Sequence, residues 1–271
     1  LVGSEMCIRD SNNAVEMFDL PNNTPKINME GIPKIKSKSK VRKENDEQRY
    51  NVLVLDTSAS SSFLDSSGNI FYTADTAIDY VKASAKKFIE GVQKADGTNY
   101  VAIVEYKGST ANVVSEFSTD FVSLNAAIDG LYASQNTRNV AAGLQKADTL
   151  INEISNPKAI KNVVLFTTGM TNDGEYSYDG HYNEDTIGSE WRRSDTQVRL
   201  YAYSNAAYAM AETLKSKATV YSVGLFQMME NMPEEGLEIV QFFKLFSSEL
   251  ATSLEPVSYT HLRAHETGAY L

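Results

Sequence analysis

The sequence has one cysteine, no long apolar run and no excess of basic residues, and each absence narrows the possible functions. The single Cys7 leaves no basis for a disulfide framework. No run of about 18 consecutive apolar residues occurs, so the sequence predicts no membrane-spanning helix. The formal net charge of −10 argues against non-specific binding to nucleic acid, which needs a basic surface. The 271 residues, 42% of them hydrophobic, suit one large globular domain or two small ones.

The two ends of the chain, residues 1–11 and 257–271, resemble translated read-through of a sequencing-library adapter. The segment from Glu5 to Asp10 can be encoded by a DNA run whose reverse complement encodes Val257 to Leu262. Two unrelated peptide tails would rarely be related in this way. We therefore interpret both segments as adapter artefacts and leave them out of the reasoning about the fold. Cys7 falls within the first of them, and we expect the native fragment to be open at both ends.

Residues 12–48 are predicted to be a linker or the end of a preceding domain. The segment is polar and contains a basic run from Lys34 to Lys43. Such runs are usually solvated linkers. The functional alternative is a basic arm that binds a surface. The acidic domain next to this segment is also expected to attract it.

Residues 49–256 are predicted to form an α/β domain, because aliphatic runs alternate with segments of helical period. Continuous aliphatic runs such as that at 50–56 are typical of strands covered on both faces. Asp120 is a predicted helix cap, and Gly108 a predicted hairpin turn. The expected strands lie at 50–56, 99–108, 111–119, 162–169 and 219–226, and the expected helices at 74–92, 121–133, 140–154, 203–217 and 234–253. This order predicts a doubly wound, mostly parallel sheet with one antiparallel edge strand and helices on both faces.

Polar side chains follow the first strand of this domain at alternate positions. Asp56 ends the strand, and Ser58 and Ser60 come next. Ligands of such sheets bind beyond the carboxyl ends of the strands, near a switch in strand order. One carboxylate and two hydroxyls are hard oxygen donors suited to Mg²⁺. A cation there would keep an open position that an incoming carboxylate could fill.

The order of these elements, with the Asp-Thr-Ser-Ala-Ser run after the first strand, resembles a von Willebrand factor type A domain over about residues 50–254. The Asp56-x-Ser58-x-Ser60 run resembles the metal-ion-dependent adhesion site of that family. The later segment "NDGEYSYDGHYNED" is similar to segments in bacterial surface-protein versions of the domain. The resemblance implies a Rossmann-like fold whose last strand would follow Glu255 and is expected to be missing. It also implies a Mg²⁺ or Mn²⁺ cofactor, a protein ligand that supplies an acidic side chain, an extracellular or cell-surface location and no catalysis. Nucleic acid and direct membrane insertion are not expected.

Two positions depart from the family pattern. Thr137 is the candidate for the next metal ligand, but counting back from Gly143 puts Arg138 at that position, and its guanidinium would oppose a cation. Thr168 stands where the family typically has an aspartate, and Asp173 or Glu175 could substitute for the lost carboxylate. The candidate metal residues are therefore Asp56, Ser58, Ser60 and Thr137, with Thr168 and Asp173 as further candidates. The alternative is a decayed site in a metal-independent structural or assembly module.

Other interpretations of the polar residues have less support in the sequence. A phosphotransfer nucleophile at Asp56 lacks the usual second acid, because Ser58 stands in its place. The sequence contains no Gly-x-x-x-x-Gly-Lys loop of the kind that binds phosphate. A hydrolase that pairs a serine with His181 would need a Gly-x-Ser-x-Gly elbow, which is also absent from the sequence. Four aromatic residues are predicted either to contact a partner or to pack against one another within their loop: Tyr176, Tyr178, Tyr182 and Trp191. Core positions are expected of Phe242, Phe243, Leu245, Phe246 and Leu250.

Overall fold

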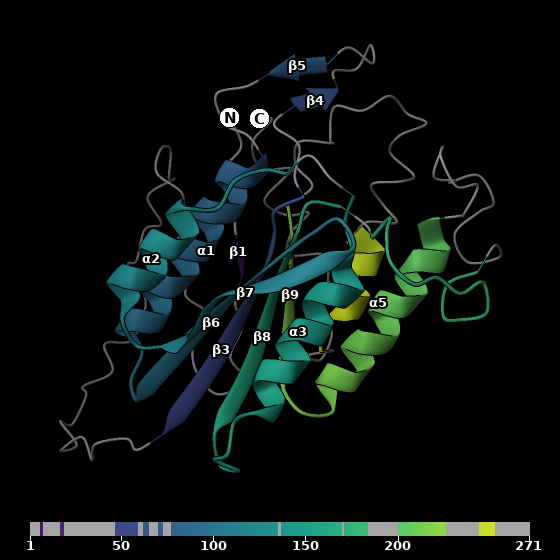
Figure 1. The fold of residues 1–271 in the computed structure, drawn as a ribbon. Helices are drawn as coiled ribbons and strands as arrows, with labels where there is room; N and C mark the ends of the chain where they lie inside the picture. The colour runs from purple at the N-terminus through teal and green to yellow at the C-terminus, as the bar shows by residue number, and fades with distance from the viewer. Residues whose placement is uncertain are drawn as a thin grey trace, which may run out of the picture.

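A computed structural model describes a five-stranded sheet at the centre of the molecule (Figure 1). Its strands, in spatial order, are β7 (Thr110–Ser118), β6 (Thr98–Lys107), β3 (Gln48–Asp56), β8 (Ile160–Thr167) and β9 (Thr219–Gly224). Two short hairpins pair β1 (Met6–Cys7) with β2 (Met17–Phe18) and β4 (Ser62–Leu64) with β5 (Ile70–Tyr72). The described residues are 6–7, 17–18, 47–58, 62–64, 70–72, 77–134, 137–169, 171–183, 200–225 and 244–252.

The sheet confirms the predicted topology. β3 is parallel to β6 on one side and to β8 on the other, and β9 is parallel to β8. β7 is the antiparallel edge strand, joined to β6 by the tight turn at Gly108, where φ is +56°. Because the chain adds strands first on one side of β3 and then on the other, the carboxyl end of β3 lies at the switch in strand order.

Helices cover both faces of the sheet, as Figure 1 shows. α1 (Ala77–Lys94) and α2 (Phe121–Asp129) lie on one face, and α3 (Val140–Asn152) and α5 (Leu200–Lys215) lie on the other. The period of two in β3 divides its aliphatics between the two cores: Val52 and Val54 face α3 and α5, and Leu53 and Leu55 face α1 and α2. Continuous burial on both faces explains why this strand is aliphatic throughout.

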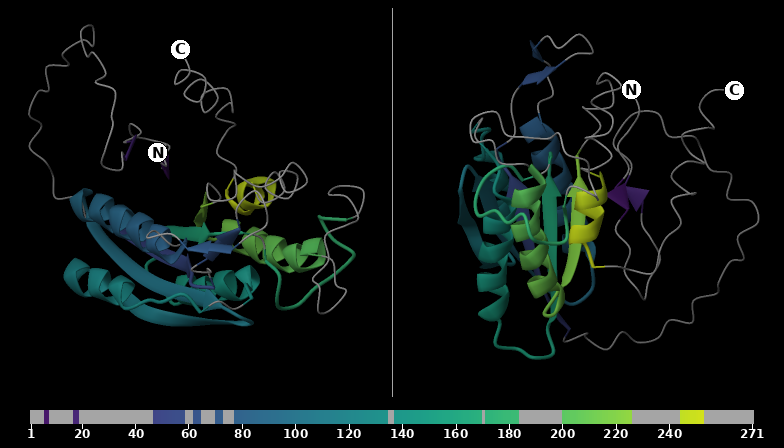
Figure 2. Two further views of the ribbon diagram at one scale, coloured as in Figure 1. Left: turned by 90° about the horizontal axis from the view of Figure 1, so that it is seen from above. Right: turned by 90° about the vertical axis from the view of Figure 1, so that its right-hand side faces the viewer.

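Helical residues 244–250 lie beside α5 and β9 in the views of Figure 2. Ser247 shares a 2.7 Å hydrogen bond with Ser222 of β9, and Lys215 of α5 donates to the Glu249 carbonyl at 2.6 Å. Phe246 and Leu250 are fully buried, which confirms them as core. The same prediction for Leu245 is wrong, because its side chain is 43% exposed on the outer side of the helix.

Most predicted elements are confirmed, with shifts at their ends. Asp120 caps α2 by accepting from the backbone N–H groups of Val122 and Ser123 at 3.1 and 3.2 Å. α2 is shorter than expected and ends at Asp129, and α5 starts at Leu200. Four residues of the sequence predictions lie outside the described residues: Ser60, Trp191, Phe242 and Phe243. The region after Glu255, where the last strand of the family is expected to be missing, also lies outside them. Within the described part of the chain, none of the helices combines the length and the apolar character needed to cross a bilayer.

Replacing Gly143 of α3 with alanine tests how closely this helix approaches the sheet. A Cβ at this position would lie 2.8 Å from Cγ1 of Val54 and 3.0 Å from Cδ1 of Tyr106. We expect Gly143→Ala to lower the free energy of unfolding by about 1–2 kcal/mol, because overpacking outweighs the higher helix propensity of alanine. Chemical denaturation measures the change. Gly130→Ala is the control, since its Cβ would come no closer than 3.5 Å to its surroundings; equal stability of the two variants would contradict the expectation.

Candidate functional site

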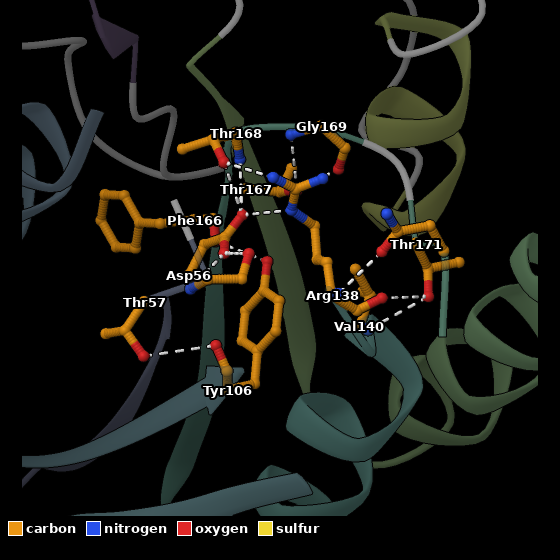
Figure 3. Close-up of polar contacts among 12 residues, drawn as sticks. Asp56, Thr57, Tyr106, Arg138, Val140, Phe166, Thr167, Thr168, Gly169 and Thr171 are labelled. Carbon is orange, nitrogen blue, oxygen red and sulfur yellow. Dashed lines mark hydrogen bonds and ion pairs between the residues drawn. The ribbon is translucent and has the colours of Figure 1, made fainter. Parts of the chain in front are cut away.

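Asp56, the last residue of β3, is the centre of a polar network at the carboxyl edge of the sheet (Figure 3). Its side chain has no exposure to solvent. Oδ1 accepts from the backbone N–H of Ser58 at 3.1 Å and from the Ser58 hydroxyl. Oδ2 accepts from the backbone N–H and hydroxyl of Thr168, at 2.9 and 2.8 Å, and from Nε of Arg138 at 2.7 Å. Both carboxylate oxygens are therefore used by protein donors.

Arg138 comes from the loop that leads into α3, and its guanidinium forms an ion pair with Asp56. Nη2 also donates to the Thr168 hydroxyl at 3.0 Å, and the side chain is only 18% exposed. Gly169 leaves room for the group, because a Cβ there would lie 2.8 Å from Nη1 of Arg138. The guanidinium thus fills the space in front of the Asp56 carboxylate, as Figure 3 shows.

The backbone of Arg138 is held by the segment that follows β8. Its N–H donates to Oδ1 of Asn172 at 2.7 Å. Its carbonyl accepts from the backbone N–H of Asn172 and from the Thr171 hydroxyl, both at 2.9 Å. The next residue, Asn139, caps α3 by accepting from the Ala142 N–H at 3.0 Å. These contacts place residue 138 immediately before the cap and direct its side chain to the sheet edge.

The structure brings together some of the predicted site residues and separates others. Ser58 and Thr168 both contact the Asp56 carboxylate. Thr137, by contrast, donates its hydroxyl to the carboxylate of Asp173, so the two candidates pair with each other. Arg138, predicted only as an occupant that would oppose a cation, is the residue of this loop that reaches Asp56. Asn172 and Gly169 were not predicted, because nothing in their local sequence indicates which loop they contact.

The arrangement does not fit the divalent cation that the family resemblance implies. Within the described residues, no group of three or more histidine, cysteine, aspartate or glutamate side chains could hold a metal ion. Among the described residues of the network, Asp56 supplies the carboxylate, and a positive charge already lies 2.7 Å from its Oδ2. Since cation affinity depends on the number of charged ligands, a neutral hydroxyl at Thr168 lowers it further. With Arg138 in this position, a second cation at Asp56 would be repelled.

Tyr106 of β6 lies beside the carboxylate and stays protonated. Its hydroxyl donates to the carbonyl of Phe166 at 3.0 Å, and the ring is fully buried. Burial first, and the nearby Asp56 charge second, raise the pKa of this phenol well above its ordinary value. Tyr106 therefore adds no charge to the network, and Arg138 remains the group that neutralises Asp56.

The fold and its polar edge define a Rossmann-like α/β domain with a polar network at the switch in strand order. Residues 51–171 match the family model of the von Willebrand factor type A domain. We conclude that the chain carries a von Willebrand factor type A domain, which confirms the family predicted from the sequence. The metal-ion-dependent type of the site and the origin of the two termini stay predictions.

Two solved structures share this fold at low sequence identity, and one further protein matches part of the sequence. The PilB minor pilin of Streptococcus sanguinis superposes with a TM-score of 0.52 and 15% identity, over 91% of this chain and 66% of the pilin. The von Willebrand factor domain of the type V pili tip protein Mfa5 of Porphyromonas gingivalis gives 0.50 and 14%, over 77% and 88%. A collagen alpha-1(VI) chain of Xenopus laevis is 25% identical over 99 residues, which span 36% of this chain and 10% of the collagen chain.

A double-mutant cycle on Asp56 and Arg138 tests the ion pair. We expect Arg138→Met to lower the free energy of unfolding by about 3 kcal/mol, because it leaves a buried carboxylate without its counter-charge. Adding Asp56→Asn should recover part of this loss, with a coupling energy of about 1–3 kcal/mol. Chemical denaturation of the four proteins measures it. The control cycle uses Lys86→Met and Asp129→Asn, an exposed ion pair whose coupling should stay below about 1 kcal/mol. Equal coupling in the two cycles would contradict the central role of Arg138.

Proposed function

We propose that this chain is a protein-recognition module, used in adhesion or assembly, of a larger surface or secreted protein, and that it works without a divalent cation. The observation that carries the proposal is the ion pair between Arg138 and the fully buried Asp56. A guanidinium fixed in front of the carboxylate supplies the positive charge that a bound cation would otherwise supply. A binding role, with no catalytic step, is part of the proposal.

Thr168 supports the metal-independent form. Its hydroxyl accepts from Arg138 at 3.0 Å and donates to Asp56 at 2.8 Å, so it bridges the two charged groups. An aspartate here would form a second carboxylate beside Asp56 and would leave the single guanidinium to neutralise both. A neutral hydroxyl matches the charge that Arg138 provides. The two departures from the family pattern therefore compensate each other electrostatically.

The names of similar proteins support the proposed role in a surface or secreted protein. Two of them are pilus proteins of bacteria, and the third is a collagen chain. On this basis we propose a protein partner and an extracellular or cell-surface location, in a bacterial protein of which this domain is one part.

The second candidate function is cation-dependent adhesion. In this form, Mg²⁺ or Mn²⁺ would be held by Asp56, Ser58 and Ser60, and an acidic side chain of the partner would complete its coordination. The hydroxyls of Ser58 and Thr168 next to Asp56 favour it. Thr137 and Asp173, already paired with each other, are the remaining candidate ligands. This form requires Arg138 to leave the carboxylate, which makes it the less favoured of the two.

Calorimetric titration with Mg²⁺ and Mn²⁺ distinguishes the two forms. For the wild type we expect no binding heat at millimolar cation and the same unfolding temperature with Mg²⁺ as with a chelator. For the double variant Arg138→Ser, Thr168→Asp we expect cation binding, because a repelling charge is removed and a carboxylate is added. Circular dichroism checks that the variant is folded.

Asp56→Ala added to the double variant is the control, and it should abolish the cation binding. Heat in the wild type that disappears in Asp56→Ala alone would overturn the metal-independent proposal and support cation-dependent adhesion.

A further inference from the structure

Two exposed tyrosines form an aromatic surface on the segment that follows the Asp56 network. Tyr176 and Tyr178 are 54% and 46% exposed, and their rings meet edge to face with centroids 5.9 Å apart. Two exposed carboxylates, of Glu175 and Asp179, flank them in the chain. We call these four residues the tyrosine surface. Tyrosines are good anchors for protein partners because they bury a large area with few rotatable bonds.

Helix α5 holds the tyrosine surface in place. Tyr176 packs edge-on against Tyr203 and Tyr178 against Tyr201, with centroids 5.7 and 6.1 Å apart. Both supporting tyrosines belong to α5 and are 4% exposed. The Ser177 N–H donates to the Ala202 carbonyl at 3.0 Å, and Asn205 donates to the Ser177 carbonyl at 2.9 Å. A surface fixed before binding loses little entropy when a partner arrives.

The chemistry of this surface fits a cationic segment. Residues 171–180 contain no lysine or arginine. Neither Glu175 nor Asp179 forms an ion pair with any residue that the structure describes. The faces of tyrosine rings attract ammonium and guanidinium groups, and carboxylates beside them add ion pairs. A partner with several lysines or arginines in an extended segment would use both kinds of contact.

The chain itself contains such a segment. Six basic residues and no acidic ones occur between positions 34 and 43: Lys34, Lys36, Lys38, Lys40, Arg42 and Lys43. This basic run precedes β3 in the sequence, and β3 begins at the amino edge of the sheet. The tyrosine surface lies at the opposite edge, because Ser177 is bonded to the first turn of α5, near the carboxyl end of β8 (Figure 1).

The length of the chain limits how much of the basic run can reach the tyrosine surface of its own copy. The nine residues of β3 span about 30 Å. Glu47 is fixed at the amino edge, because its carbonyl accepts from the Thr98 N–H at 2.9 Å. Lys43 is four residues before Glu47 and reaches at most about 14 Å from it. Lys34 is 13 residues before Glu47 and reaches at most about 45 Å from it. The carboxyl part of the run, from Lys40 to Lys43, therefore cannot reach the tyrosine surface of its own chain, whereas a neighbouring copy can receive all six basic residues.

We propose that the tyrosine surface of one copy binds the basic run of a second copy, residues 34–43, in a head-to-tail contact. The inference deepens the proposed assembly function and rests on it. Because the two contacting surfaces differ, the contact is heterologous, and further copies can add until the row of domains closes into a ring.

Sedimentation velocity of the full chain tests the proposal. We expect association that increases with protein concentration at low salt and is lost at high salt, since the contact joins opposite charges at a surface. Tyr176→Ser with Tyr178→Ser should weaken the association at least tenfold. The matched control is Tyr132→Ser, which removes another exposed tyrosine, 66% exposed, and should leave the association unchanged.

A charge exchange identifies the two contacting parts. Glu175→Lys with Asp179→Lys, and separately Lys36→Glu, Lys38→Glu and Lys40→Glu, should each give a chain that stays monomeric at low salt. Mixing the two variants should restore association, because the unaltered basic run of the first variant then meets the unaltered tyrosine surface of the second. Circular dichroism checks the fold of both variants.

A wild type that stays monomeric at low salt, or a mixture that does not associate, would overturn the assignment of a second copy as partner. Neither result changes the cation titration, so this proposal can fail while the metal-independent recognition module stands.

Discussion

A carboxylate with no exposure to water must be neutralised, and this constraint governs the polar edge of the domain. Asp56 ends the central strand at the switch in strand order, where the fold itself buries it. Burying an ion without a counter-charge has an effective penalty of several kcal/mol. Arg138 supplies that counter-charge, and Ser58 and Thr168 supply the remaining hydrogen bonds. Three further features support the same ion pair. Gly169 leaves room for the guanidinium, the Thr168 hydroxyl accepts from it, and Asn172 holds the backbone of Arg138.

The architecture could be predicted from the sequence because its signals are local. The aliphatic run of β3 indicates burial on both faces, and Asp120 indicates a helix start through a contact with its own neighbours. Element ends were less accurate, as at α5, and Leu245 was wrongly assigned to the core. The period of a short helix defines its apolar face only to within about one residue, because successive side chains differ by 100° in direction. Leu245 adjoins Phe246, which takes the buried direction.

The candidate site was only half predictable, for a physical reason. Asp56, Ser58 and Thr168 follow strands, so the sheet fixes where they lie. Thr137 and Arg138 follow no strand, and which of them faces Asp56 depends on the path of a loop. That path is determined by hydrogen bonds to Thr171 and Asn172, more than 30 positions away in the sequence. A shift of one residue exchanges a hydroxyl for a guanidinium, and with it the sign of the charge that the site can accept.

This exchange also changes how a partner could be recognised. A bound cation offers a coordination position that a partner's carboxylate can enter, whereas a guanidinium paired with Asp56 offers no such metal coordination. Recognition in the metal-independent form must then use side chains beyond the ion pair. The segment that carries Tyr176 and Tyr178 starts at the residues that hold the backbone of Arg138, and it is fastened to α5 at Ser177. Arg138 thus contacts Asp56 through its side chain and holds one end of the tyrosine segment through its backbone, and its proposed role becomes the positioning of a binding surface.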